Sequence, residues 1–227
     1  MELDPRRLVV VTGAGGFIGG HLVAELKNRG HERIRAVDLK PLGRWYQEHE
    51  GVENVSADLR EVDPCQAVSA DATYVFNLAA DMGGMGFIET HKADCMVSVL
   101  INTNMLIAAR DHGVEHFMFG SSACVYNGER QTDPNVTALK ESDAYPALPE
   151  DGYGWEKLFS ERMCRHFMED EVHEPINLGS SQLVSINELV DIVEGIAGVK
   201  LDDGLTKTIA YFDALLRGNE DYGRVGR

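Results

Sequence analysis

The chain has 227 residues, of which 44% are hydrophobic, so it can bury a full core and is longer than one typical domain. Its formal net charge of −16 excludes general nucleic-acid binding and anionic-membrane binding, because both need an excess of Lys and Arg. No apolar run has transmembrane length, and no apolar signal segment precedes the first expected strand. The cysteines show neither metal-ligand spacing nor short-range pairing, so we expect reduced thiols, no metal site and a cytoplasmic protein.

A strand, a glycine-rich turn and a helix follow one another near the N-terminus. Residues 8–11 are an apolar, mostly β-branched run, which is typical of a buried parallel strand. Gly13, Gly16 and Gly19 then follow at three-residue intervals, and helical periodicity begins at His21. Glycines let backbone N–H groups approach a phosphate, and a helix N-terminus adds partial positive charge. We therefore predict that this turn binds the pyrophosphate of a dinucleotide.

Asp38 ends the second predicted strand, residues 34–38. It stands roughly 20 residues after the glycine turn, where an acid binds the ribose hydroxyl groups of a dinucleotide. Its charge would repel a 2′-phosphate, so we expect NAD and not NADP. The alternative is a solvated aspartate at the end of a strand.

Strands and helices alternate to about residue 170, which predicts a Rossmann-type, doubly wound parallel sheet of the α/β class. Further strands are expected at residues 52–58, 72–80 and 114–120, and a long amphipathic helix at residues 95–112. A glycine-rich loop, residues 81–87, follows the fourth strand. Ligands bind at the carboxyl ends of central strands in such sheets, although a flexible connector would have the same composition.

Tyr153 and Lys157 lie four residues apart in a helical segment, residues 153–169, and so share one helix face. A lysine near a tyrosine hydroxyl lowers the pKa of the phenol and prepares it to take a proton from an alcohol. This spacing alone is common on helix surfaces. Together with the glycine turn and with Ser122 after the fifth strand, it predicts a site that oxidises an alcohol.

These motifs together resemble the extended short-chain dehydrogenase/reductase family. The matching positions are residues 12–19, Asp38, Asp58, Leu59, residues 77–80, Ser121, Ser122, Tyr153 and Lys157. Within the family, the sequence is most similar to the GDP-mannose 3,5-epimerases, through residues 77–88, 121–126 and 139–147. The resemblance extends from residue 8 to about residue 200.

The resemblance implies a site for NAD and for a nucleotide-sugar. The NAD-contacting positions that it implies are Gly13, Gly16, Phe17, Ile18, Gly19, Asp38, Asp58, Leu59, Leu78, Ala79, Ala80, Tyr153 and Lys157. The substrate-contacting positions that it implies are Gly83, Ser122, Ala123, Cys124 and Tyr153.

The resemblance also implies the chemistry of the site. Tyr153, assisted by Lys157 and Ser122, deprotonates the C4 hydroxyl of the sugar while hydride passes to NAD. The resulting 4-ketone acidifies the protons on C3 and C5. Cys124 and a second residue then move those protons, because a thiol can act as a base and then as an acid. The alternative for Cys124 is a small buried hydrophobic side chain.

The sequence departs from the family pattern at two places. Ser98 stands where the family usually has an asparagine, and the family's sixth strand, substrate loop and second catalytic lysine do not follow Asp170. We therefore expect an NAD-binding Rossmann domain at residues 1–170 and an incomplete substrate-binding domain at residues 171–227. Discontinuities near 170/171 and 201/202 would make the working protein longer than this sequence. The alternative is a shortened relative that only binds NAD.

We predict an NAD-dependent nucleotide-sugar epimerase, an isomerase, that acts on GDP-mannose at C3 and C5. A 4-epimerase or a 4,6-dehydratase would keep NAD and Tyr153 but would not need Cys124. A noncatalytic NAD-binding relative is the third alternative. Members of the family commonly pair through two helices, which implies a homodimer formed by residues 95–112 and 153–169.

Overall fold

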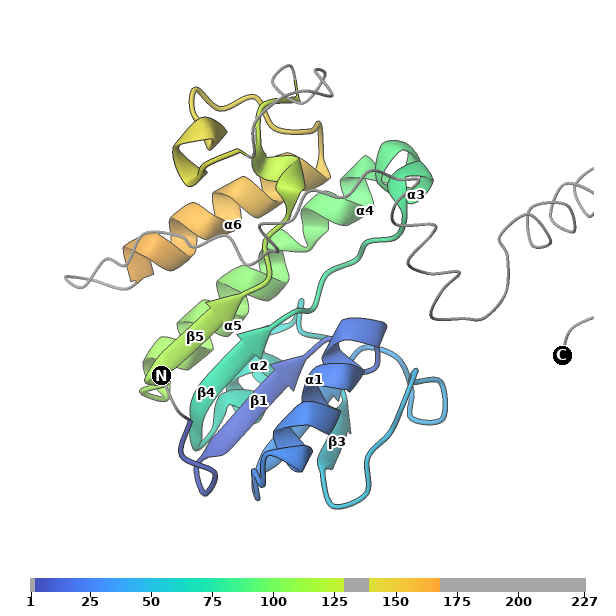
Figure 1. Ribbon diagram of the computed structural model, residues 1–227, viewed down its shortest axis with the longest axis vertical. Helices are drawn as coiled ribbons and strands as arrows, with labels where there is room; N and C mark the ends of the chain where they lie inside the picture. The colour runs from blue at the N-terminus through green and yellow to red at the C-terminus, as the bar shows by residue number, and fades with distance from the viewer. Residues whose placement is uncertain (1–2, 129–138, 168–227) are drawn as a thin grey trace, which may run out of the picture. The chain divides into compact units, whose positions relative to one another are not determined.

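The computed structural model describes residues 3–128 and 139–167 of the chain. At the centre is a parallel sheet of five strands in the order β3-β2-β1-β4-β5 (Figure 1). The strands are β1 (Leu8–Thr12), β2 (Ile34–Asp38), β3 (Glu53–Ser56), β4 (Ala72–Asn77) and β5 (His116–Phe119). Every neighbouring pair is parallel, so all five strands end at the same edge of the sheet. The predicted Rossmann-type architecture is confirmed.

Helices alternate with the strands as expected, except that β3 follows β2 without a helix among the described residues between them. They are α1 (Phe17–Asn28), α2 (Val62–Ser69), α3 (Met85–Thr90), α4 (Lys92–Val97), α5 (Val99–Asp111) and α6 (Tyr153–Phe167). The single helix predicted at residues 95–112 is instead α4 and α5, which meet at Ser98. α5 ends as expected, because Gly113 has a φ of 67° and the Val114 N–H bonds to the Ala109 carbonyl.

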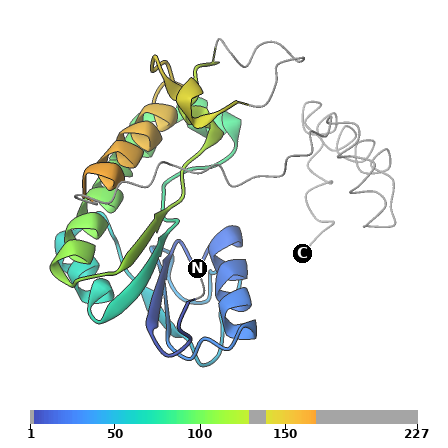
Figure 2. The ribbon, with the colours of Figure 1, turned by 60° about the vertical axis from the view of Figure 1, so that its left-hand side comes forward.

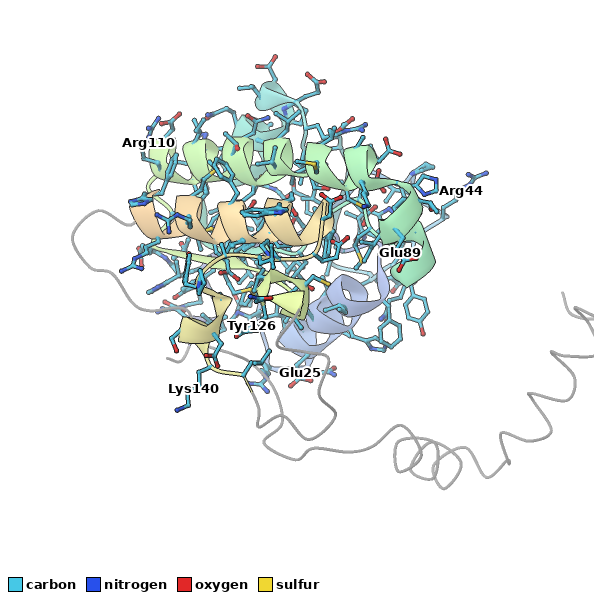
Figure 3. The ribbon with its side chains drawn as sticks, turned by 90° about the horizontal axis from the view of Figure 1, so that it is seen from above. Glu25, Arg44, Glu89, Arg110, Tyr126 and Lys140 are labelled. Carbon is cyan, nitrogen blue, oxygen red and sulfur yellow. The ribbon has the colours of Figure 1, made fainter. Side chains whose placement is uncertain are left out.

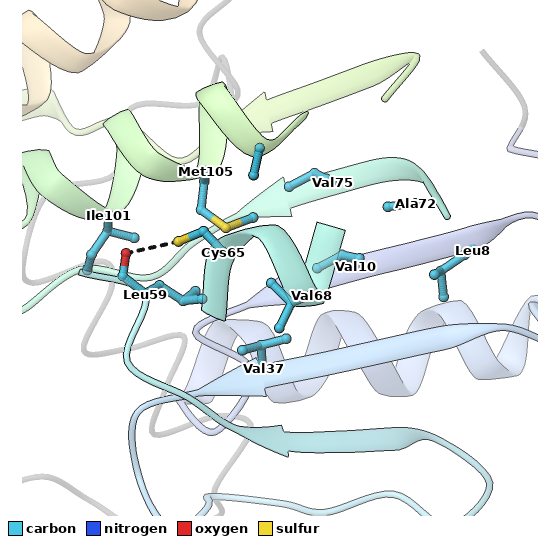
Figure 4. Close-up of a cluster of buried hydrophobic side chains, with 11 residues drawn as sticks. Leu8, Val10, Val37, Leu59, Cys65, Val68, Ala72, Val75, Ile101 and Met105 are labelled. Atoms are coloured by element: carbon cyan, nitrogen blue, oxygen red, sulfur yellow. Dashed lines mark hydrogen bonds between the residues drawn. The ribbon is translucent and has the colours of Figure 1, made fainter. Parts of the chain in front are cut away.

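Helices cover both faces of the sheet (Figure 2), and each face carries its own hydrophobic core. On one face, α1 packs on a set of strand residues that includes Val9. On the other face, α2 and α5 pack on the alternate residues, such as Val10 and Val75 (Figure 4). Cys65 lies within that second core and donates its thiol to the Leu59 carbonyl at 3.1 Å. Burial on both faces explains why β1 is an unbroken apolar run.

α6 lies beside α5, as seen from above in Figure 3, and contacts a short 3-10 helix, η1 (Ala123–Val125). Within residues 3–128 and 139–167, no helix is both long and apolar enough to span a bilayer. All four cysteines are free thiols. The predicted discontinuities near 170/171 and 201/202, and the domain at residues 171–227, lie outside the described residues.

Candidate active site

Glycines shape the turn between β1 and α1 at positions where a side chain does not fit. Gly13 has a φ of 67°, and a Cβ there would lie 3.0 Å from the carbonyl carbon of Leu78. A Cβ on Gly19 would overlap the Gly13 carbonyl oxygen, so α1 starts directly against the turn. Phe17 and Ile18, the first residues of α1, are exposed. α1 has no side-chain N-cap, and the first N–H groups of a helix have no acceptor within it, so the turn offers backbone donors to an anion.

The Thr12 side chain connects the ends of β1 and β4 by hydrogen bonds. Its hydroxyl donates to the side-chain oxygen of Asn77 at 2.8 Å and accepts the N–H groups of Leu78 and Ala79, each at 3.0 Å. Two predicted cofactor positions after β4, Leu78 and Ala79, therefore lie next to the glycine turn, and the third, Ala80, is half-buried.

Asp38 lies at the end of β2 with its carboxylate against the same turn. Its Oδ2 accepts the Gly15 N–H at 3.0 Å, and its Oδ1 accepts the Lys40 N–H at 2.9 Å. The structure adds Trp45, which the sequence motifs did not single out, to this part of the site. Trp45 is 9% exposed and packs so closely on Gly15 that a Cβ there would lie 2.9 Å from its ring. The sequence signal that could have identified Trp45 as a buried residue is its large aromatic side chain within a mostly polar segment.

Asp58 and Leu59 lie after β3 and have different surroundings. Asp58 forms an ion pair with Arg60 at 2.6 Å, and its hydrogen bond with Arg60 holds its pKa below the usual value. Leu59 is 4% exposed, and its side chain belongs to the core on the α2 and α5 face. The Leu59 side chain is therefore a packing element of the structure.

The segments after β4 and β5 meet at Tyr153. Tyr153 is the first residue of α6, is 5% exposed, and packs in one cluster with Ile88, Cys95 and Cys124. Burial raises the pKa of Tyr153 to about 12, while a hydrogen bond with Ser122 opposes this shift. The Ser122 hydroxyl also accepts the Cys124 N–H at 3.2 Å. The structure thus brings the predicted Tyr153, Ser122 and Cys124 together.

Two glycines let the surrounding segments approach this cluster. A Cβ on Gly154 would overlap the Cys124 carbonyl oxygen, so only glycine allows α6 to start this close to η1. Gly83 is half-buried in the loop after β4, and a Cβ there would lie 2.8 Å from the Phe87 Cβ. Phe87 packs against the Tyr153 cluster, whereas Ala123, another predicted substrate contact, is exposed.

Lys157 lies one helical turn after Tyr153 and is 2% exposed. Its Nζ lies 4.6 Å from the centre of the Phe119 ring and 5.5 Å from the centre of the Tyr153 ring. The same Nζ lies 3.6 Å from Glu156 Oε2. The sequence suggested that Lys157 lowers the pKa of Tyr153, but burial of the phenol is the larger effect and raises it. Lys157 faces the ring of Tyr153 and forms its ion pair with Glu156.

Residues 9–188 match the model of the NAD dependent epimerase/dehydratase family. The chain belongs to this family. The predicted cofactor, NAD, is thereby confirmed, as is the resemblance to the extended short-chain dehydrogenases/reductases. GDP-mannose 3,5-epimerase 1 of Oryza sativa subsp. indica is 47% identical over 163 residues, which cover 71% of this chain and 43% of that protein. The chain therefore spans less than half the length of this relative.

Solved structures of the same fold show a similar partial coverage. A short-chain dehydrogenase/reductase superfamily protein from Agrobacterium tumefaciens with bound NAD has a TM-score of 0.59 and 27% identity, over 72% of this chain and 46% of that one. The UDP-N-acetylglucosamine 4-epimerase of Methanobrevibacter ruminantium, in complex with UDP-N-acetylmuramic acid, has a TM-score of 0.60 and 27% identity, over 73% and 51%.

A buried polar chain joins the family's glycine turn to α6, and it was not apparent from the sequence. Asn77 donates its amide to Asn102 Oδ1 at 3.1 Å, and Asn102 donates to the Ser160 carbonyl at 3.3 Å. The Ser160 hydroxyl donates to Glu156 Oε1 at 2.9 Å. Polar residues at core positions of amphipathic helices were the only signal for these contacts.

Ser98, at the position where the family usually has asparagine, is buried and points to the loop after β4. Its hydroxyl accepts the Asp81 N–H at 2.9 Å. This bond fixes the start of the glycine-rich loop at the junction of α4 and α5. Among the residues with described positions, no three or more His, Cys, Asp or Glu side chains are grouped to hold a metal ion.

Proposed function

We propose that the chain supplies the NAD-binding and proton-transferring part of a nucleotide-sugar epimerase that converts GDP-mannose at C3 and C5. The observation that carries the proposal is the cluster of Tyr153, Ser122 and Cys124 at the sheet edge where the glycine turn also lies. The 47% identity with a GDP-mannose 3,5-epimerase supports the choice of substrate.

The residues at this edge fit NAD. The glycine turn would bind the pyrophosphate through its backbone N–H groups. Glycine at positions 13 and 19 makes this tight turn possible, because Cβ atoms there would overlap neighbouring backbone. Asp38 would accept the hydroxyl groups of the ribose. When bound, NAD supplies the acceptor and the later donor of a hydride.

Tyr153 would take the proton of the C4 hydroxyl and return it at the end of the reaction. A phenol with a pKa of about 12 gives a strongly basic phenolate, so the site has to stabilise that anion. The Ser122 hydroxyl can donate to it, and the nearby Lys157 ammonium offsets its charge.

Cys124 would then act on the 4-keto sugar. The Cys124 thiolate would remove the acidified proton from one face of a carbon next to the ketone, and a second residue would return a proton to the opposite face. Protons balance over the cycle, because each one removed is replaced. Cys124 packs in the Tyr153 cluster, which supports its assignment to the same substrate.

The test is incubation of the chain with NAD and GDP-mannose in heavy water, followed by mass and proton NMR analysis of the sugar. We expect deuterium at C3 or C5 and products inverted at those carbons, while a Tyr153→Phe control gives neither. Inversion at C4 without ring deuterium would instead identify a 4-epimerase, and loss of water would identify a 4,6-dehydratase. Bound NAD without any turnover would identify a noncatalytic relative.

We also propose that the protein is a cytoplasmic homodimer. Five large apolar side chains lie exposed on α4, α5 and α6: Met96, Val97, Leu100, Trp155 and Phe159. Since α5 and α6 lie side by side, these residues, the α4–α6 face, offer apolar area to a second copy. The free thiols support a cytoplasmic location.

A further inference from the structure

Glu156 is a buried carboxylate that neither NAD binding nor the proposed proton transfers use. It lies on α6 between Tyr153 and Lys157 and is 3% exposed. The Ser160 hydroxyl donates to its Oε1 at 2.9 Å. Its Oε2 accepts no hydrogen bond within the described residues and lies 3.6 Å from Lys157 Nζ. A carboxylate is rarely buried so fully unless it is paired with a cation.

Within its surroundings, Lys157 depends on the ion pair with Glu156 to keep its charge. The rings of Phe119 from β5 and of Tyr153 from α6 flank the ammonium, and neither can neutralise its charge. The titratable groups that act on it are Glu156, Cys164 and Glu161, all on α6. Burial lowers the pKa of Lys157, and Glu156 is the largest influence that raises it. Burial in turn raises the pKa of Glu156, and Lys157 opposes that shift.

We propose that Glu156 is a positioning residue that holds Lys157 as a fixed ammonium beside Tyr153, a role that rests on the function proposed for Tyr153. Ser160 orients the carboxylate, and the Asn102 bond to the Ser160 carbonyl connects this part of α6 to the end of β4. A neutral Lys157 could not stabilise a phenolate, so Glu156 acts on the reaction through Lys157.

Removal of the Glu156 charge changes the pH at which Lys157 loses its proton. Glu156 raises the pKa of Lys157 and also raises the pKa of Tyr153. Without this charge the pKa of Lys157 falls, so Lys157 loses its proton at lower pH and no longer stabilises the phenolate there. For Tyr153, the loss of the repelling carboxylate and the loss of the ammonium act in opposite directions. The alkaline limb of the pH profile of the hydride step, which reports loss of the Lys157 proton, therefore moves to lower pH. A merely structural role would lower the rate without moving the profile.

The experiment follows NADH formation by the full chain with NAD and GDP-mannose over a range of pH, for the wild type and for Glu156→Gln. We expect the alkaline limb of the Glu156→Gln profile to lie at lower pH, with a rate that falls about tenfold per pH unit beyond it. Glu156→Asp keeps the charge and should keep the profile. Glu161→Gln is the matched control, because Glu161 contacts Ser121 and only weakly influences Lys157. An unmoved profile in Glu156→Gln, or an equal shift in Glu161→Gln, would overturn the proposal.

A second measurement needs no substrate and separates this proposal from the proposed function. If the wild type forms no NADH from any nucleotide-sugar, the function fails, and the pH dependence of unfolding by urea decides the role of Glu156. Glu156→Gln depresses the folded-state pKa of Lys157 further, so the unfolded chain binds more protons over a wider range below the ordinary lysine value. Its stability should therefore rise with pH from a lower pH than in the wild type. Identical pH dependence would contradict the proposal.

The Ser160→Ala variant covers the case in which Glu156→Gln does not fold. It removes the hydrogen bond to Glu156 Oε1 and leaves the ion pair. The hydrogen bond favours the charged carboxylate, so its loss should move the pH profile in the same direction by a smaller amount. No movement in Ser160→Ala would count against the proposal.

Discussion

At the scale of single residues, the chemistry depends on which buried groups carry a charge. Cys124 and Cys95 pack in the same cluster with Tyr153, but they differ in surroundings. Cys95 is completely buried, and burial raises the pKa of its thiol, which keeps the thiol protonated at neutral pH. Cys124 is half-buried, and Ser122 accepts its backbone N–H. This contrast makes Cys95 the matched control for the role of Cys124.

We expect Cys124→Ala to leave NADH formation measurable but to slow the entry of solvent deuterium into the sugar ring by about 10²–10⁴-fold, which is the usual contribution of a positioned acid or base. Alanine keeps a small apolar side chain, so the fold should persist. Deuterium entry is measured by NMR, with Cys95→Ala as the control that exchanges at the native rate. Native exchange in Cys124→Ala would mean that the thiol only fills space.

At the scale of elements, the buried polar chain holds α5 and α6 in register with the sheet. Asn102 accepts from Asn77 on β4 and donates to the backbone of α6, so one side chain connects three elements. It is 1% exposed, and water cannot replace either bond without a rearrangement. The contact therefore holds α6, which carries both Tyr153 and Lys157, against α5 and the end of β4.

Asn102→Ala should lower the free energy of unfolding by about 1–3 kcal/mol, because it leaves the Asn77 amide and the Ser160 carbonyl buried without their partner. Unfolding by urea at neutral pH measures this loss. Asn104→Ala is the control, since Asn104 donates to the Arg60 carbonyl at the surface and should cost about 1 kcal/mol or less. Equal losses in the two variants would argue against a special role for the buried chain.

At the scale of the whole molecule, exposed apolar area and net charge have opposite effects on the association of two copies. The α4–α6 face exposes Trp155 by 43% and Phe159 by 55%, which favours association of two copies. Each copy also carries a formal net charge of −16, which repels another copy over about one Debye length. The balance between the two terms makes the proposed dimer sensitive to salt.

We expect Phe159→Glu to weaken the dimer by about 30-fold or more, since a central aromatic contact contributes about 2 kcal/mol or more and the new charge adds to the repulsion. Sedimentation at several protein concentrations measures this change, and added salt should strengthen the wild-type dimer. Leu42→Glu is the control, because Leu42 is 49% exposed and lies outside the α4–α6 face. A monomeric wild type, or equal weakening in both variants, would sink the dimer proposal.

The sequence by itself determined the parts of this protein that depend on local pattern. The apolar run of β1, the spacing of Gly13 and Gly19, and Asp38 at a strand end predicted the sheet and the cofactor, because side-chain periodicity and glycine geometry act over a few residues. The break at Ser98 was not predicted, because it involves a bond to the distant loop at Asp81.

Only the tertiary structure decided the electrostatics of the site. The pKa of Tyr153 rises because segments far apart in sequence bury its phenol, and Lys157 forms its ion pair with Glu156, which also lies in the interior. A helical pattern shows that Tyr153 and Lys157 share a face, but it does not show how much water that face loses. Since desolvation depends on the packing of several elements at once, it became visible only when the fold was complete.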